Sequence, residues 1–332
     1  MKNTTNTPLS NFCNGLRRLL ASGGGFTSAL VLLVALLAGG CENSQPGTSR
    51  MTSGRLVVAV DEAYAPLFRA LADSFMARTP NAKIEVQEMN PRMAVQYLLD
   101  HYNDTTASFA AIIGRQLLPD ESEAIAKSNL QPRQYAIAYD GLAVVVPAAS
   151  PFKQTTREDL VAALRSPSPT TEQIESGVPS APLSFVIPDQ NSSAFALLRQ
   201  LLPRDSTIVA PARYVSRADS VNTLVADGKG VGVVGWYVAH RDSVRLRTLY
   251  MGYTDSLSRH HTPARVHPSS LVTDVYPLKQ PIVGYTFADV KSVANGFLIA
   301  VSKGRESQRY IVEQGLQAEN VKLRLVTPEA EE

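Results

Sequence analysis

The chain has 332 residues, of which 44% are hydrophobic, so it can bury a large core and is long enough for about two domains. Its formal net charge is only +2. No cluster of basic and aromatic residues is present that could neutralise phosphates while it stacks bases. We therefore expect no nucleic-acid partner.

The N-terminal stretch has the zones of a secretory signal. Basic residues precede an uninterrupted apolar run at 29–38, which is too short to cross a membrane comfortably. Residues 37–41 (Leu-Ala-Gly-Gly-Cys) resemble a bacterial lipobox, although Ala38 stands where leucine is usual. We expect a signal peptide over residues 1–40 and lipidation of Cys41. An uncleaved N-terminal anchor is the alternative, and both place the remaining chain outside the cytoplasmic membrane.

The cysteine count also bears on stability. The chain has two cysteines, Cys13 and Cys41, and the first lies inside the signal. A cleaved chain then has no internal disulfide, so its stability must come from the core.

Residues 41–54 are rich in Ser, Thr, Pro, Gly and Asn without an apolar period, which is typical of a flexible tether.

Strands and helices alternate after the tether. Residues 55–60 form a short apolar run that predicts a strand, and a helix begins within 61–66, since Leu67, Leu71 and Phe75 recur at every fourth position. The next expected elements are a strand at 83–87, a helix at 92–101 opened by Pro91, a strand at 109–113 and a helix at 120–127.

Residues 136–147 (AIAYDGLAVVVP) are apolar on both sides of Asp140 and Gly141, which predicts a central strand of a covered sheet. A buried hairpin that turns at Asp-Gly is one interpretation. Because the flanks do not alternate polar and apolar residues, we favour a strand that passes straight through, with Gly141 at a bend between two sheets. This segment would join two α/β lobes.

The alternation of strands and helices continues beyond residue 147. Residues 253–275 are polar and expected to be irregular. The expected elements are helices at 156–164, 194–202, 216–226, 288–301 and 305–314, and strands at 183–187, 228–234, 246–251, 281–285 and 321–326. The strand at 281–285 would be a second crossover between the lobes. An acidic tail at 328–332 ends the chain.

No enzyme signature is present. The five histidines lack the spacing of a metal site, and no G-x-S-x-G elbow, Walker loop or dinucleotide fingerprint occurs. We therefore expect no enzyme, no cofactor and no metal. A hydrolase built from scattered carboxylates is the alternative, but nothing singles out a pair.

Loops that end a strand and begin a helix carry small polar residues. The clearest is 187–195, and loops 90–92 and 61–64 have the same position in their own units. Free backbone donors at a helix start, next to such side chains, can bind an anion. If the strands converge at one edge, these loops face a common cleft. Ordinary helix capping is the alternative for each loop. The side chains in question are Tyr64, Asn90, Arg92, Asn191, Ser192 and Ser193.

Four segments in this order resemble phosphate-binding proteins of phosphate ABC transporters, the PstS-like family. They are 139–147 (YDGLAVVVP), 188–193 (PDQNSS), 230–235 (GVGVVG) and 276–278 (YPL). The resemblance runs from about residue 56 to residue 326. It implies an α/β, two-lobed periplasmic-binding-protein-like fold of type II, each lobe a mixed β-sheet flanked by helices, joined by two crossover strands.

The resemblance also implies bounds and a function. Lobe I would comprise 55–138 and 283–327, and lobe II 139–282, with 328–332 as the tail. The protein would be a monomeric lipoprotein on the periplasmic side of the cell envelope. It would bind inorganic phosphate, or a related oxyanion, and deliver it to an ABC permease.

The ligand loops depart from the family pattern. Where the family has Arg-Ser-Asp-Gly-Ser-Gly-Thr, this chain has residues 188–194, so that Pro188 replaces the arginine and Ala194 the threonine. Only Ser192 matches cleanly. The family's Gly-Ser-Gly loop corresponds to residues 89–92.

The family's Ser-Asp, whose carboxylate accepts a proton from monohydrogen phosphate, corresponds to Gly114 and Arg115. Arg92 and Arg115 would then replace the missing arginine and favour a fully ionised anion. Alternatively, both arginines are solvated and the cleft binds something else. A non-transport envelope lipoprotein, a sensor or docking module with a degenerate cleft, is the second hypothesis.

Overall fold

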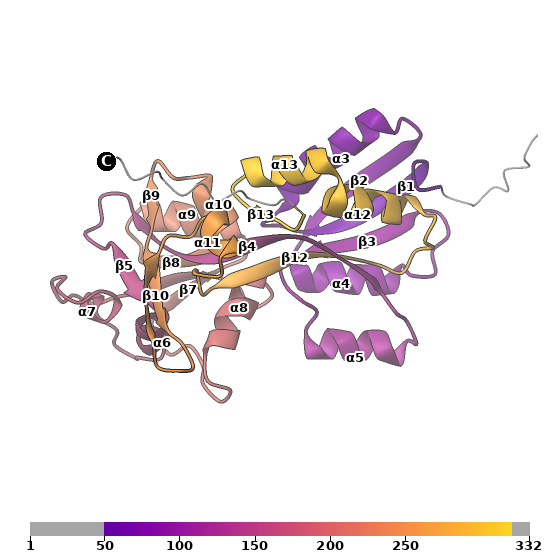
Figure 1. Ribbon diagram of the computed structural model, residues 1–332. Helices are drawn as coiled ribbons and strands as arrows, with labels where there is room; N and C mark the ends of the chain where they lie inside the picture. Colours follow the sequence, from indigo (N-terminus) through magenta and orange to yellow (C-terminus); the bar gives the residue numbers. More distant parts are fainter. Residues whose placement is uncertain (1–49, 321–332) are drawn as a thin grey trace, which may run out of the picture. The chain divides into compact units, whose positions relative to one another are not determined.

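The computed structural model describes residues 50–320 (Figure 1). The expected signal peptide, Cys41, most of the tether, the strand at 321–326 and the tail lie outside these residues. Within them, no helix is both long and apolar enough to span a membrane.

The strands are β1 (Gly54–Asp61), β2 (Ala82–Met89), β3 (Ser108–Ile113), β4 (Arg133–Pro147), β5 (Gln154–Thr156), β6 (Phe185–Pro188), β7 (Ala212–Val215), β8 (Val231–Gly235), β9 (Leu246–Thr248), β10 (Tyr250–Thr254), β11 (His260–Ala264), β12 (Lys279–Thr286) and β13 (Gln317–Ala318). The helices are α3 (Ala65–Arg78), α4 (Pro91–Asp100), α5 (Pro119–Lys127), α6 (Arg157–Leu164), α7 (Thr171–Ile174), α8 (Ser193–Leu201), α9 (Ala218–Ala226), α10 (Trp236–His240), α11 (Pro268–Val272), α12 (Val293–Lys303) and α13 (Arg305–Glu313).

A mixed sheet organises the described residues. Its strand order is β2-β1-β3-β12-β4-β8-β6-β7, with β13 and β9 also paired to β4. Strand β1 is parallel to β2 and β3, whereas β12 is antiparallel to both β3 and β4. On the other side, β6 is parallel to β7 and β8. This mixed α/β architecture confirms the expected fold class.

Strand β4 passes straight through the middle of the sheet, so the continuous-strand interpretation is confirmed and the hairpin interpretation is wrong. Gly141 is opposite Lys279 of β12, and the next residue, Leu142, is opposite Gly235 of β8. The change of partner therefore falls directly after Gly141. We call β1, β2, β3 and β12 with their helices the first half of the sheet, and β6, β7 and β8 with theirs the second half. The residue bounds expected for the lobes stay a prediction.

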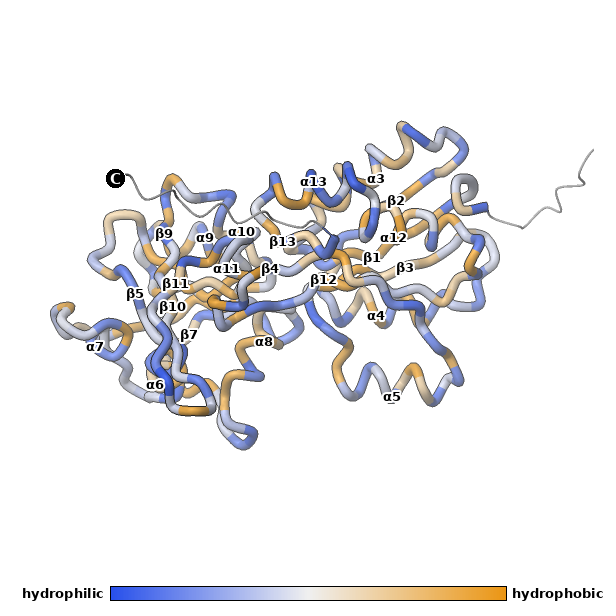
Figure 2. Tube along the Cα trace, in the orientation of Figure 1, coloured by the Kyte–Doolittle hydropathy of each residue, from blue (hydrophilic) through white to orange (hydrophobic). Residues whose placement is uncertain are grey.

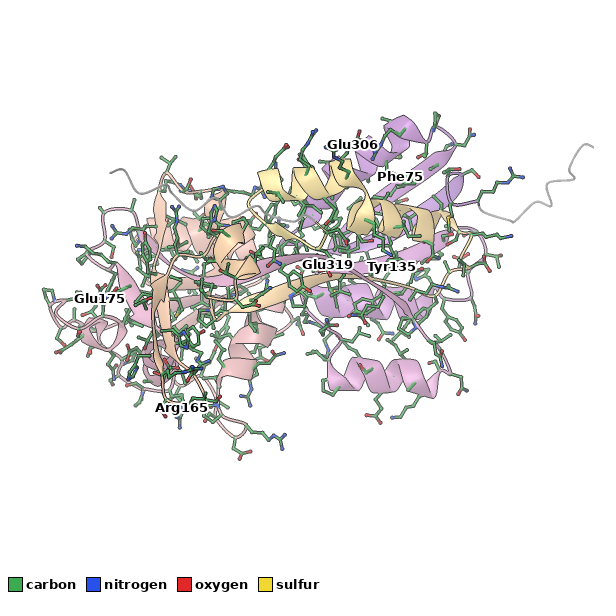
Figure 3. All side chains as sticks on the ribbon, in the orientation of Figure 1. Phe75, Tyr135, Arg165, Glu175, Glu306 and Glu319 are labelled. Atoms are coloured by element: carbon green, nitrogen blue, oxygen red, sulfur yellow. The ribbon has the colours of Figure 1, made fainter. Side chains whose placement is uncertain are left out.

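Helices cover both faces of the first half because its inner strands β1 and β3 are apolar on both sides (Figure 2). In β1, Val58 and Val60 belong to the core cluster that includes α3 and α12, whereas Val57 and Ala59 belong to the cluster that includes α4. Phe75 of α3 packs edge-on against a phenylalanine of α12 (Figure 3). The buried positions of α3 include Leu67, Leu71 and Phe75, as the fourfold spacing predicted.

The prediction that residues 253–275 are irregular is wrong. They contain β11 and α11, and β11 joins β10 and β5 in a second, three-stranded sheet. The sequence of β11, His-His-Thr-Pro-Ala, has no apolar alternation, so backbone pairing with β10 determines its conformation.

Other element boundaries also differ from those predicted from the sequence. Strands β9 and β10 replace the single strand expected at 246–251, since β9 pairs with β4 and β10 with β5. The helix expected to begin within 61–66 begins at Ala65, because Asp61 is still part of β1. Strand β7 and the short helices α7 and α10 were not predicted.

Candidate functional site

A buried carboxylate lies where three strand-to-helix loops meet. Asp61, the last residue of β1, is 1% exposed. Its Oδ1 accepts from the Ala63 amide at 3.2 Å, and its Oδ2 accepts from the Gly114 amide at 3.1 Å and from Ser193 Oγ at 2.5 Å. Ser193 is the first residue of α8, in the second half of the sheet. Asp61 thus collects donors from both halves.

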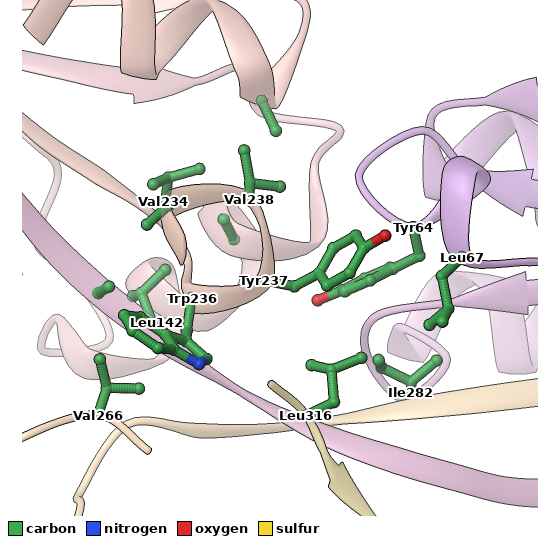
Figure 4. Close-up of a cluster of buried hydrophobic side chains, with 14 of the residues drawn as sticks. Tyr64, Leu67, Leu142, Val234, Trp236, Tyr237, Val238, Val266, Ile282 and Leu316 are labelled. Atoms are coloured by element: carbon green, nitrogen blue, oxygen red, sulfur yellow. The ribbon is translucent and has the colours of Figure 1, made fainter. Parts of the chain in front are cut away.

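A second buried carboxylate lies in the middle of β4. Asp140 is fully buried and accepts from the Gly141 amide at 2.8 Å and from the Tyr237 amide at 3.1 Å. Tyr64 donates its hydroxyl to Asp140 Oδ2 at 2.9 Å, and Gln280 Nε2 donates to the same hydroxyl at 2.6 Å. The rings of Tyr64 and Tyr237 pack against each other with centroids 5.7 Å apart (Figure 4). The first half, β4 and the second half are therefore bonded to one another here.

A third carboxylate reaches the start of α9. Glu62 Oε1 accepts from the Ala218 amide at 2.9 Å, and nearby Glu88 of β2 forms an ion pair with Arg217 at 2.6 Å. Ala218 and Arg217 belong to the second half, whereas both glutamates belong to the first. Acidic side chains of the first half therefore bond to the starts of α8 and α9, where donors lack partners within the helix.

Burial makes these carboxylates hard to ionise. Desolvation raises the pKa of Asp61, and it raises the pKa of both Glu62 and Asp140 to about 7. The hydrogen bond from Ser193 and the positive charge of Arg115 act in the opposite direction on Asp61. The charge of Asp61 in turn raises the pKa of the other two carboxyls.

Little space is left between the halves at this point. A cavity of about 10 Å³ is lined by Asp61, Glu62, Ser193 and Gln280, among others. This volume suits about one water molecule and is too small for a tetrahedral oxyanion. Gln280 is 3% exposed, and its Oε1 is buried without a hydrogen-bond partner in the described structure. The carboxylate of Asp61 fills the position that the surrounding donors could offer to an anion.

Six of the seven residues expected from the sequence to bind an anion fall into two groups. Tyr64, Ser192 and Ser193 line the small cavity. Ser192 caps α8 by accepting from the Phe195 amide at 3.0 Å, as the capping alternative proposed.

The second group lines a larger cavity of about 440 Å³ formed by α4, α5 and the loop before α8. Asn90, Arg92 and Asn191 contribute to its wall. Asn90 caps α4 by accepting from the Met93 amide at 2.9 Å, and Arg92 forms an ion pair with Asp120.

Arg115 is absent from the lining of both cavities. Its guanidinium is buried and donates to both carboxylate oxygens of Glu121 at 2.7 Å. Its Nε is buried without a partner among the described residues. Both arginines that were expected to supply the missing cation are thus already paired with carboxylates.

Reasoning from the sequence missed the acidic residues at the centre. Two features of the sequence could have identified them. Asp61 ends a strand that is otherwise mostly apolar, and Asp140 lies in the middle of a second apolar strand. Asp61 was interpreted only as part of a helix start. No feature of the sequence marked Gln280 as part of the site. Within residues 50–320, no group of histidine, cysteine and acidic residues has the arrangement of a metal site.

A family model described as a PBP superfamily domain matches residues 45–298. The chain belongs to this superfamily. The matched region includes every candidate residue named above except Cys41. The resemblance to periplasmic phosphate-binding proteins is thereby confirmed for the superfamily, and the solved structures extend the agreement to the fold.

Several solved structures are similar to this PBP-superfamily protein. One, described as a phosphate ABC transporter substrate-binding protein with bound phosphate, from Clostridium perfringens, is 15% identical, with a TM-score of 0.65 over 81% of this chain and 100% of that chain. An ABC-type phosphate transport receptor from Vibrio cholerae is 19% identical, with a TM-score of 0.58 over 79% and 99%. An OxyR mutant from Corynebacterium glutamicum is 13% identical, with a TM-score of 0.51 over 93% and 77%. No curated protein sequence matches this chain.

Proposed function

We propose that this protein is an extracytoplasmic solute-binding protein that binds an inorganic oxyanion, with phosphate the first candidate, and delivers it to an ABC permease. One observation carries the proposal. Donors from three separate loops, namely the Ala63 amide, the Gly114 amide and the Ser193 hydroxyl, converge on one carboxylate. Donors that hold a carboxylate in this way can also hold a phosphate oxygen.

Binding in this cleft would form or break no covalent bond. The two halves would close over the anion by a hinge movement about β4 and β12, the strands that link them. The phosphate-binding proteins with a similar fold support this assignment, which makes the protein a binding component and not an enzyme.

The N-terminal sequence supports a location on the periplasmic side of the envelope. In this proposal residues 1–40 are removed, and a lipid on Cys41 tethers a monomer to the membrane. The mass of the mature chain would show the acylated Cys41 directly. A Cys41→Ser chain recovered from the membrane fraction would instead favour the uncleaved anchor.

A second function, an envelope lipoprotein that senses or docks to a partner without transport, is favoured by a different observation. The space beside Asp61 is only about 10 Å³, and the donors that an anion needs are already used. A cleft that is permanently closed by its own carboxylate would bind no solute.

Isothermal titration of the mature chain with phosphate, sulfate and arsenate separates the two functions. We expect heat with at least phosphate, whereas heat with none of the three would reject oxyanion binding. Ser193→Asp should abolish binding, because it places a second carboxylate opposite Asp61. Ser168→Asp, on an exposed loop of the second half, is the matched control and should bind as the unmodified chain does.

A further inference from the structure

Asp61 makes the contacts that a bound anion would make. Its Oδ2 is shared between Gly114 of the first half and Ser193 of the second, so it bridges the cleft as a ligand between two lobes does. The adjacent Glu62 bridges the cleft in the same sense, through the amide of Ala218. The closed arrangement of these loops is therefore satisfied by side chains of the protein itself.

We propose that Asp61 is an internal ligand that holds the cleft closed when no solute is bound, and that a solute anion must displace its carboxylate to enter. The second part rests on the proposed function, whereas the first part does not.

The bridge is strong enough to matter. The hydrogen bond is 2.5 Å long and both side chains are buried, so breaking it without a substitute would leave polar groups unpaired in a dry environment. Gly114 allows the close approach, since a Cβ there would lie 2.4 Å from the ring of Tyr64 and 3.1 Å from Cβ of Ser193.

The Gly114 amide and the Ser193 hydroxyl cannot donate to a solute anion and to the Asp61 carboxylate at the same time. The small cavity has no room for both, and a second acidic side chain, Glu62, also lines it. Like charges at this separation in a buried site repel strongly. Binding a solute therefore requires that the halves separate and that Asp61 leave Ser193. The apparent affinity for the solute is lowered by the fraction of molecules that are closed on Asp61.

The test measures closure and anion binding separately. Spin labels are placed on cysteines introduced at Asp73 and Arg204, which are exposed in the first and second halves. The full chain also carries Cys13→Ser and Cys41→Ser, so that only these positions react. The distance between the labels is then measured by pulsed electron resonance, without phosphate and along a phosphate titration.

Three variants are compared with this labelled chain. Asp61→Ala removes the internal ligand, and Ser193→Ala removes its partner across the cleft while Asp61 keeps its own-half contacts. Glu306→Ala is the control, since Glu306 pairs with Arg78 entirely within the first half. If Asp61→Ala fails to fold, Ser193→Ala still tests the bridge.

Without phosphate, we expect a single short distance in the unmodified and Glu306→Ala chains, and longer distances in Asp61→Ala and Ser193→Ala. Equal distances in all four chains would overturn the internal ligand. Along the titration, Asp61→Ala should close at a phosphate concentration about tenfold or more below that of the unmodified chain. Closure at equal concentrations would overturn displacement. If the first result holds and neither chain responds to phosphate, the internal ligand stands and the proposed oxyanion function fails.

Discussion

The hydroxyl of Tyr64 lies 2.9 Å from Oδ2 of Asp140, although 76 residues separate them in the chain. Both side chains are buried, and Gln280 completes the network from β12 by donating to the same hydroxyl. This contact joins the turn before α3 to the strand that runs through both halves of the sheet. Its loss should therefore be measurable as a loss of stability.

We expect Tyr64→Phe to lower the free energy of unfolding by about 1–3 kcal/mol, because Asp140 loses a donor and Gln280 loses its acceptor in a dry environment. Urea denaturation of the variant and the unmodified chain gives this value. Tyr102→Phe is the control, since Tyr102 is 43% exposed, and it should change the free energy by less than about 0.5 kcal/mol. Equal effects of the two changes would argue against the network.

The pH dependence of stability should carry the signature of Glu62 and Asp140. Burial raises the pKa of both carboxyls to about 7, so in the folded state they keep protons that the unfolded chain releases near its ordinary pKa values. Stability should therefore fall as the pH rises from about 4.5 to 7, by up to about 1.4 kcal/mol per pH unit for each group.

Glu62→Gln provides the check on this assignment. Glutamine keeps an oxygen that can accept from the Ala218 amide but has no proton to lose, so the decline in stability between pH 4.5 and 7 should become shallower. Denaturation series at several pH values measure the slope. An identical slope in Glu62→Gln and the unmodified chain would show that Glu62 has an ordinary pKa.

Gly114→Ala should destabilise the protein by about 1–3 kcal/mol, because the new methyl would lie 2.4 Å from the Tyr64 ring, which has no free space to move into. A double-mutant cycle isolates the cause. In the Tyr64→Ala background the ring is gone, and the alanine at 114 should cost much less. Additive effects would place the clash elsewhere.

The buried ion pair between Arg115 and Glu121 leads to another test. Arg115→Met alone should cost about 3–5 kcal/mol, because it leaves a carboxylate buried without its cation. Arg115→Met combined with Glu121→Leu should recover most of this loss, apart from the hydrogen bond that Glu121 accepts from the Leu118 amide. Urea denaturation measures both variants.

The same double variant tests whether Arg115 contributes to anion binding. If it does, phosphate titration of the double variant should show no heat although the chain is folded. If Arg115 only stabilises the loop before α5, the affinity should be unchanged.

Much of the fold could be predicted because it follows from local apolar patterns. The buried positions of α3 repeat at every fourth residue, and the apolar flanks of Asp140 correctly indicated one continuous strand. Strand β11 could not be found in this way, since none of its residues is buried, its sequence has no apolar pattern, and its pairing with β10 determines its conformation.

The site was predictable only in part, for a related reason. Small polar residues before a helix identify free donors, and this is how Ser193 was found. Which group satisfies those donors depends on contacts between distant segments, and Asp61 is separated from Ser193 by 132 residues. A carboxylate in that role looks like an ordinary capping residue until the two halves are seen together.

The position of β12 constrains the order in which the chain can fold during synthesis. This strand lies between β3 and β4, yet residues 148–278 are made between β4 and β12. Until residue 286 leaves the ribosome, β3 and β4 lack the neighbour that joins them, and the N-terminal strands wait with an open edge. The second half is one continuous segment of the chain and can therefore assemble first. Until β12 is made, the open edge of the N-terminal strands can pair with other chains and has to be protected from them.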